Sequence, residues 1–183
     1  KIRMINDFLP NTQITLPTNG SMFDEENTIK LCAVRTLKVI NFSVNAYFDE
    51  TYTWFMGLPA SNIKQIETAL KRIAILRPDI DAHVSMVFDP MYQTDLELVL
   101  FKEYWHSLGV KAFALPAASA NRTGKGKYNT GLTTPCRSIY SDMVIGFDGL
   151  LSSCCFDSSF EMELGKFTGD IIKDWHNEYL EGI

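Results

Sequence analysis

Up to residue 115, apolar positions along the chain switch between the period of a strand and the period of a helix. Short runs rich in β-branched residues predict strands, and longer segments with an apolar residue at every third or fourth position predict helices. The predicted strands are 13–16, 37–44, 80–88 and 110–115, and the predicted helices are 1–9, 25–34, 61–76 and 94–108. Strands that alternate with helices in this way are typical of an α/β fold, in which crossover helices connect the strands of a parallel sheet.

Local signals mark several ends of these elements. Asp24 and Ser61 are predicted to cap the helices that follow them, because their side-chain oxygens can accept hydrogen bonds from N–H groups of the first turn. Gly109 is expected just after the helix at 94–108, since glycine readily adopts the left-handed conformation found there. The strand at 37–44 is apolar enough to predict burial on both of its faces.

The segment from 45 to 59 is polar and aromatic, and no helix or strand is predicted in it. Its aromatic side chains are expected either to line a substrate cleft or to belong to the core: Tyr47, Phe48, Tyr52, Trp54 and Phe55.

The carboxyl ends of the predicted strands are small or polar. They comprise Thr18-Asn19-Gly20, Ser43-Val44-Asn45, 85–89 and 116–124. In a parallel α/β sheet the active groups gather at these ends, whether the sheet is open or forms an incomplete barrel. The sequence therefore predicts a ligand-facing rim at this edge.

A second region follows from Cys136 onward. An apolar strand at 143–147 runs into Asp-Gly at 148–149, which predicts a hairpin with a two-residue type I′ turn. Such a hairpin would carry Cys154 or Cys155 back towards Cys136, so either a metal or iron–sulfur site or a set of buried thiols is expected. A final helix is predicted at 169–180.

Composition narrows the function classes. The net charge of −5 and the absence of a basic stripe argue against nucleic acid as a partner. No apolar run approaches the ~20 residues that a membrane span requires. Four cysteines without a secretion signal favour the cytoplasm, and Cys32 is expected to be a core residue. The three histidines share no metal-binding spacing; His83 is predicted to be a strand residue, and His106 and His176 to lie on helix surfaces.

The cysteine-bearing region resembles the SPASM extension of radical S-adenosylmethionine enzymes. The resemblance rests on Cys136, twelve residues, Gly149, four residues and Cys154, followed by Leu164-Gly165 and Trp175. It implies that Cys136 and Cys154 are ligands of an auxiliary [4Fe–4S] cluster, with Cys155 as the alternate ligand. Thiolates suit zinc as well, so the ligand type leaves iron and zinc open.

The α/β region is similar to the partial (β/α) barrel of the same enzymes, from its third strand onward. Thr18-Asn19-Gly20 matches a strand end that is common in that family, and Ser43-Val44-Asn45 stands where the family often has Ser-x-Asp-Gly. A third match is Asn-Arg-Thr-Gly at 121–124. The resemblance implies that Thr18, Asn19, Ser43 and Asn45 contact S-adenosylmethionine.

Together the two resemblances divide the chain into a barrel part at 1–116, a linker at 117–134 and a SPASM-like extension at 135–183. They imply an oxidoreductase that modifies a peptide or protein substrate and takes electrons from a reductant such as flavodoxin or ferredoxin. The family's CxxxCxxC and Gly-Gly-Glu segments are absent from the sequence. The chain is therefore expected to be a piece of the enzyme that is inactive alone. The alternative is a non-catalytic α/β binding module with a structural zinc or cluster site.

Overall fold

The computed structural model describes residues 11–117, 141–152, 157, 160 and 163–175. The chain divides into two units, Lys1–Ala117 and Ala118–Ile183. The predicted helix at 1–9 lies outside the described residues, as does the predicted linker except for Ala117.

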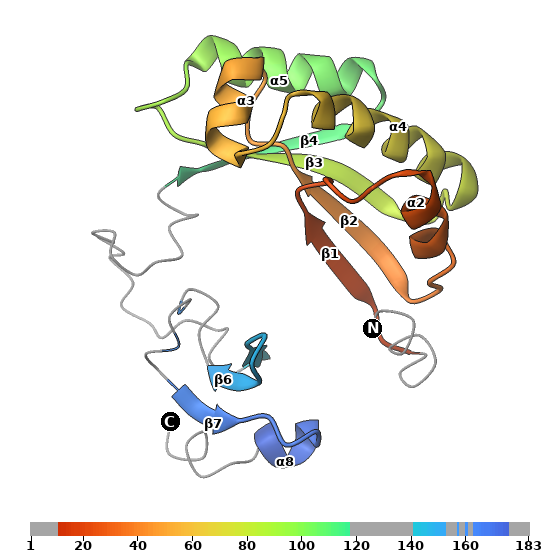
Figure 1. Cartoon of the computed structure of the whole chain (residues 1–183), viewed down its shortest axis with the longest axis vertical. Coiled ribbons are helices and arrows are strands. Elements are labelled where there is room, and N and C mark those ends of the chain that lie inside the picture. The colour runs from red at the N-terminus through yellow and green to blue at the C-terminus, as the bar shows by residue number, and fades with distance from the viewer. Residues whose placement is uncertain (1–10, 118–140, 153–156, 158–159, 161–162, 176–183) are drawn as a thin grey trace. The chain divides into compact units, whose positions relative to one another are not determined.

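The described part of the first unit alternates strands and helices as the sequence predicts (Figure 1). The strands are β1 (Ile14–Thr18), β2 (Leu37–Ser43), β3 (Asp81–Phe88) and β4 (Lys111–Pro116), and the helices are α2 (Glu25–Cys32), α3 (Asp49–Met56), α4 (Ser61–Leu76) and α5 (Asp95–Ser107). All neighbouring strands pair in parallel, in the order β1-β2-β3-β4, which confirms the predicted parallel sheet.

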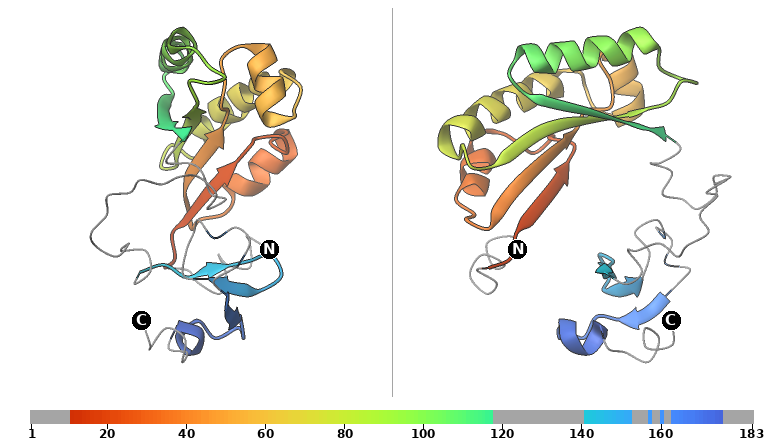
Figure 2. Two further views of the ribbon diagram at one scale, coloured as in Figure 1. Left: turned by 90° about the vertical axis from the view of Figure 1, so that its left-hand side faces the viewer. Right: turned by 180° about the vertical axis from the view of Figure 1, so that it is seen from behind.

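The strand order decides where the helices lie. Each strand follows its neighbour in sequence, and right-handed crossovers that all step in one direction place every helix on the same face of the sheet. Figures 1 and 2 show α2, α4 and α5 on this one side, which we call the covered face. No helix of the described unit covers the opposite side, which we call the open face.

The core lies between the covered face and the helices. Ile40 and Phe42 of β2 are completely buried, and so are Val84 and Met86 of β3. Their helical partners are also buried: Ile66, Ala69, Leu70 and Ile73 from α4, and Phe101 and Trp105 from α5. Burial of each large apolar side chain stabilises the fold by roughly 1.5–3 kcal/mol.

Two of the three predicted helix ends are confirmed. Asp24 caps α2, because its carboxylate accepts the N–H of Asn27 at 2.7 Å. Gly109 follows α5 with φ +73°; its N–H donates to the carbonyl of His106, and Val110 N–H donates to that of Trp105, both at 2.9 Å. These are the paired hydrogen bonds of a Schellman motif.

The predicted cap at Ser61 is wrong. Ser61 is the first residue of α4, and no side chain caps that helix. Instead, the N–H groups of Asn62 and Ile63 donate to the carbonyls of Pro59 and Ala60, each at 3.0 Å. Backbone carbonyls of the preceding turn therefore accept hydrogen bonds from N–H groups of the first turn of α4, which the serine hydroxyl was expected to do.

Helix α3 was not predicted. Thr, Tyr, Trp and Phe make up most of its sequence, and all of them are weak helix formers. Two signals mark its limits nevertheless: acids in its first turn, Asp49 and Glu50, and Gly57 at its end with φ +62°. Within the helix, Tyr52 is completely buried and Trp54 is 63% exposed, so the aromatic segment is divided between core and surface.

A buried carboxylate fixes the start of α3. Glu97 of α5 is 2% exposed, and its Oε1 accepts the N–H groups of Tyr47 at 2.9 Å and Phe48 at 3.2 Å. Its Oε2 accepts the hydroxyl of Thr51 at 3.4 Å. Side-chain acceptors from a distant helix thus replace the N-cap that the local sequence lacks.

At the amino ends of the strands, Arg77 ties separate segments together. Its guanidinium donates to the carbonyls of Cys32 at 2.8 Å, Val34 at 3.1 Å and Leu37 at 3.3 Å. It also binds both carboxylate oxygens of Asp79, at 2.7 and 2.9 Å. Cys32 is buried, as predicted, and burial raises the pKa of its thiol.

The described residues of the second unit form a small antiparallel sheet and one short helix. The elements are β5 (Val144–Ile145), β6 (Leu150–Ser152), β7 (Glu163–Lys166) and α8 (Ile171–Trp175), in the sheet order β5-β6-β7. Strand β7 was not predicted. The predicted final helix coincides with α8 over its described residues, where buried Asp174 accepts the N–H and hydroxyl of Thr168, both at 2.8 Å.

The hairpin at Asp148-Gly149 is confirmed, but the predicted type I′ turn is wrong. Gly146 N–H donates to the Leu150 carbonyl at 2.8 Å, and Gly149 N–H donates to the Gly146 carbonyl at 3.0 Å. The loop therefore spans three residues, and only Gly149 among them has a positive φ, +87°. The extra loop residue shifts the strand register by one. Residues of β6 that a two-residue turn would place on one face of the hairpin therefore lie on the opposite face.

Among the residues that the structure describes, no helix has both the length and the apolar character needed to cross a bilayer.

Candidate functional site

The first predicted rim segment, Thr18-Asn19-Gly20, makes hydrogen bonds and contacts within the fold. Thr18 pairs with Phe42 and so belongs to the covered face, and its hydroxyl accepts the N–H of Gly20 at 3.1 Å. Asn19 is exposed, and its Oδ1 accepts the N–H and hydroxyl of Ser21 at 3.1 and 2.8 Å. Gly20 is buried with φ +75°, and a Cβ at this position would collide with the Ile66 side chain. The segment is a close turn packed against α4.

The second rim segment divides between the two faces. Asn45 has a positive φ of +63°, and its Oδ1 accepts the N–H of Val87 at 2.8 Å while its Nδ2 contacts the sulfur of Met56 at 3.2 Å. The hydrogen bond to Val87 extends the pairing of β2 with β3 beyond the strand end, and the contact with Met56 joins the strand end to α3. Ser43 instead pairs with Ser85 on the open face, where both side chains are half-buried.

The open face carries a polar row at its centre. Asn41 of β2 pairs with His83 of β3, which in turn pairs with Lys111 of β4. The next row towards the carboxyl ends contains Ser43 and Ser85. Because side chains alternate between faces along a strand, the two rows lie on the same side of the sheet, away from Phe42 and Val84. The predicted burial of β2 on both faces is thus wrong, since only its covered face is fully buried.

Two polar atoms in this row are buried without a hydrogen-bond partner among the described residues. They are Oδ1 of Asn41 and Nδ1 of His83. Oδ2 of Asp81 lies 3.8 Å from Nδ1, which is too far for a hydrogen bond. A buried polar atom without a partner costs about 1–3 kcal/mol, and such atoms are rare in folded proteins. Their adjacency makes the centre of the open face the candidate functional site.

Charges flank the site. Lys111 Nζ donates to Oδ1 of Asp81 at 2.7 Å, and this hydrogen bond is the main cause that lowers the pKa of the Asp81 carboxyl. Phe113 packs against the His83 ring in an edge-to-face contact, with ring centroids 5.1 Å apart, and is itself 49% exposed. The imidazole is thus held between a paired carboxylate and an aromatic ring.

The arrangement can bind a ligand that carries both donors and acceptors. Asn41 offers an acceptor, Ser43 and Ser85 offer hydroxyl groups, and His83 can donate or accept through Nδ1. Carboxylate, amino and sugar hydroxyl groups all match this set.

The predicted cluster ligands Cys136, Cys154 and Cys155 lie outside the described residues. Within the described residues no group of three or more His, Cys, Asp or Glu side chains could hold a metal ion.

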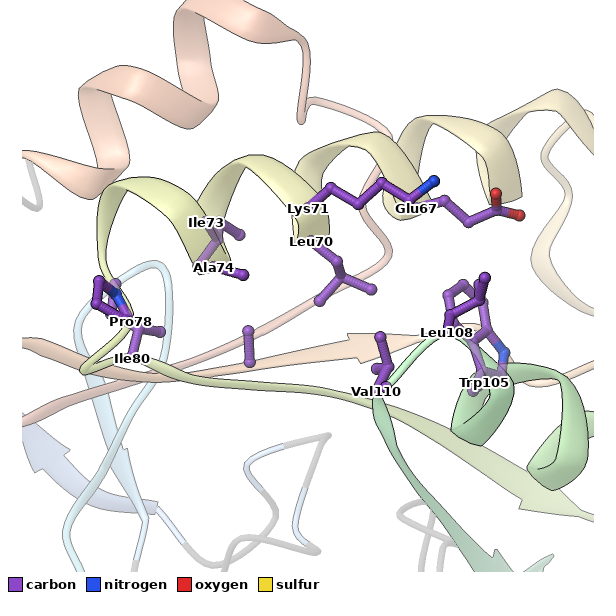
Figure 3. A pocket seen from close by; sticks show the side chains of 12 residues that line it. Glu67, Leu70, Lys71, Ile73, Ala74, Pro78, Ile80, Trp105, Leu108 and Val110 are labelled. Atoms are coloured by element: carbon purple, nitrogen blue, oxygen red, sulfur yellow. The ribbon is translucent and has the colours of Figure 1, made fainter.

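A separate hollow of about 290 Å³ lies near the amino ends of β3 and β4 (Figure 3). Leu70 and Ala74 of α4 project into it opposite Val110, and most of its other lining residues are apolar as well. It lies on the covered side of the sheet, among core residues, and its charged lining residues are Glu67 and Lys71.

Sequence reasoning missed the centre of this site. Asn41 was not predicted to be a site residue, and His83 was predicted only to be a strand residue, which it is. One signal was present: polar residues at 41 and 43, and again at 83 and 85, follow the two-residue period of one strand face.

Comparison with known proteins adds no assignment: no protein-family model matches the chain, and no curated protein matches it.

Proposed function

We propose that this chain is part of a radical S-adenosylmethionine enzyme that acts on a peptide or protein, and that the open face binds the cofactor. The observation that carries the proposal is the pair of adjacent buried atoms, Asn41 Oδ1 and His83 Nδ1, which have no hydrogen-bond partner among the described residues. The resemblance of the strand ends and of the cysteine spacing to that family supports the same proposal.

The winding of the sheet supports the proposal as well. Four parallel strands in sequential order, with their helices on one side, are the arrangement from which (β/α) barrels are built. In a barrel of this kind the open face is the inner wall, where ligand-binding groups gather towards the carboxyl ends.

The residues of the open face suit S-adenosylmethionine. Asn41 would accept from an amino or ribose hydroxyl group, whereas Ser43 and His83 would bind its carboxylate or hydroxyl groups. When bound at the enzyme's iron–sulfur cluster, the cofactor supplies hydrogen-atom abstraction from the substrate. Thr18, Asn19 and Asn45 position the strand ends through the internal hydrogen bonds described above.

In the same proposal, Cys136 and Cys154 bind an auxiliary [4Fe–4S] cluster, with Cys155 as the alternate ligand. A flavodoxin- or ferredoxin-like protein is the electron donor.

The cofactor site can be tested by isothermal titration calorimetry of the protein with S-adenosylmethionine. We expect Asn41→Ala and Ser43→Ala each to weaken binding about tenfold, which corresponds to one lost hydrogen bond. Ile75→Ala is the matched control, since Ile75 is 80% exposed at the end of α4 and does not belong to the open face. Equal affinity for all four proteins, or no binding, would contradict the proposal.

The cluster can be tested independently by iron and sulfide analysis after anaerobic reconstitution. Cys136→Ser and Cys154→Ser should each lower the bound iron and sulfide, whereas Cys32→Ser should not, because Cys32 is a buried core residue of α2. Unchanged iron content would rule out these ligands, and a colourless protein that binds zinc would favour a structural metal site.

A further inference from the structure

An exposed aromatic group lies on α3 and on the loop that follows β3. Trp54 is 63% exposed and Tyr92 is 55% exposed, yet their ring centroids are only 4.8 Å apart. Phe55 contacts both rings, at 4.9 Å from Trp54 and 6.2 Å from Tyr92. We call these three residues the aromatic patch. Large aromatic side chains that pack against each other while facing solvent are typical of protein-binding surfaces.

The patch lies near the carboxyl ends of β2 and β3. Helix α3 begins shortly after β2 ends, and Tyr92 lies four residues after the end of β3. Figure 1 shows α3 beside α5 at this end of the strands. A partner that rests on the aromatic patch is therefore bound at the carboxyl end of the sheet, the end nearer to the Ser43–Ser85 row than to the central row.

The surroundings of the patch are acidic. Neither segment that builds it, 45–59 or 84–101, contains a lysine or arginine. Asp49, Glu50 and Asp95 are exposed on these segments. Glu50 lies four residues before Trp54 on the same helix, so the carboxylate and the indole share one helix face.

A pocket of about 520 Å³ lies at the start of α3. Asp49 and Glu50 line it together with the rings of Phe48 and Tyr104. Lys64 also lines it, but its ammonium group donates to Glu67 at 2.9 Å and to Tyr104 at 3.0 Å, so its charge is compensated. Carboxylates beside aromatic rings form a favourable site for an ammonium or guanidinium group.

We propose that the aromatic patch and the adjoining acidic pocket dock a peptide segment in which apolar side chains alternate with lysine or arginine. The apolar side chains rest on Trp54 and Tyr92, and a basic side chain enters the pocket at Asp49 and Glu50. A second copy of this chain is a poorer occupant, because the chain has a net charge of −5 and two acidic patches repel each other. This inference rests on the proposed function, and it specifies the class of peptide substrate.

The test measures direct binding by fluorescence anisotropy, without S-adenosylmethionine or iron. The probe is a labelled synthetic peptide that carries leucines between lysines, and its counterpart has glutamate in place of every lysine. We expect the lysine peptide to bind at least about tenfold more tightly, with an affinity that falls as salt is added. Trp54→Ala and Tyr92→Ala should each weaken binding about tenfold, and Glu50→Gln should reduce both the affinity and its salt dependence.

Ile75→Ala is the control, because it removes an even more exposed apolar side chain from the far end of α4. All substituted side chains are exposed, and far-UV circular dichroism verifies that each variant is folded. Equal binding of the two peptides, or full binding by Trp54→Ala, would overturn the proposal. So would a dimer, detected by light scattering, that Trp54→Ala dissociates. Cofactor binding is measured separately by calorimetry. Failure of peptide binding can therefore be distinguished from failure of S-adenosylmethionine binding.

Discussion

The two faces of the sheet are built from alternating residues of the same strands, yet the side chains of the two faces have different surroundings. On the covered face Phe42 and Met86 are completely buried among helix side chains. On the open face, one residue away, Asn41 and His83 hold buried polar atoms that have no hydrogen-bond partner among the described residues. The covered face thus stabilises the fold, whereas the open face retains buried polar atoms that cost stability.

The largest expected effect is a difference in stability between alanine variants of two neighbouring residues of β2. We expect Phe42→Ala to lower the free energy of unfolding by about 3–5 kcal/mol, because it leaves a cavity in the core. Ser43→Ala should change it by less than about 0.5 kcal/mol, since Ser43 is a half-buried residue of the open face. Urea unfolding followed by circular dichroism measures both. Similar losses for the two variants would mean that the open face is packed as firmly as the covered one.

A smaller effect of opposite sign is expected at the centre of the open face. Asn41→Val removes the unpartnered Oδ1 and introduces a β-branched side chain that favours strands. We expect the free energy of unfolding to rise by about 1 kcal/mol while binding of S-adenosylmethionine weakens about tenfold, as for Asn41→Ala. The same urea titration checks the first outcome, and calorimetry checks the second. A destabilised variant would indicate that Asn41 is held by a partner within the protein.

The smallest effect concerns charges near the amino ends of the strands. Hydrogen bonds from Arg77, and then from Lys38, hold the pKa of the Asp79 carboxyl well below its usual range. A carboxylate whose pKa is lowered by folding stabilises the protein above its unfolded-state pKa of about 3.9, and this contribution is lost as the pH falls through the folded-state value. We therefore expect Asp79→Asn to be less stable than the unaltered protein near neutral pH, with a difference that shrinks in acid.

Asp81, at the edge of the open face, is the matched comparison. Lys111 lowers its pKa in the same direction, so Asp81→Asn should also reduce the loss of stability in acid, but by less than Asp79→Asn. Thermal unfolding across a series of acidic buffers measures both. If Asp81→Asn had the larger effect, the charges of the open face would matter more to the fold than the Arg77 network.

The sequence by itself determined the order and type of most elements of the first unit. Asp24 and Gly109 end their helices as predicted, and the strands alternate with helices in a parallel sheet. These features depend on interactions within about four residues, namely helical periodicity, capping and the left-handed preference of glycine, so a local pattern records them.

Only the tertiary structure decided the features that depend on distant residues. Glu97 supplies the acceptors that start α3, about fifty residues away in sequence, and weak local propensity could not predict that helix. Strand register placed Asn41 beside His83, and a ring contact joined Trp54 to Tyr92. Which side of a strand faces helices depends on the direction of every crossover in the sheet, and no single segment carries that information.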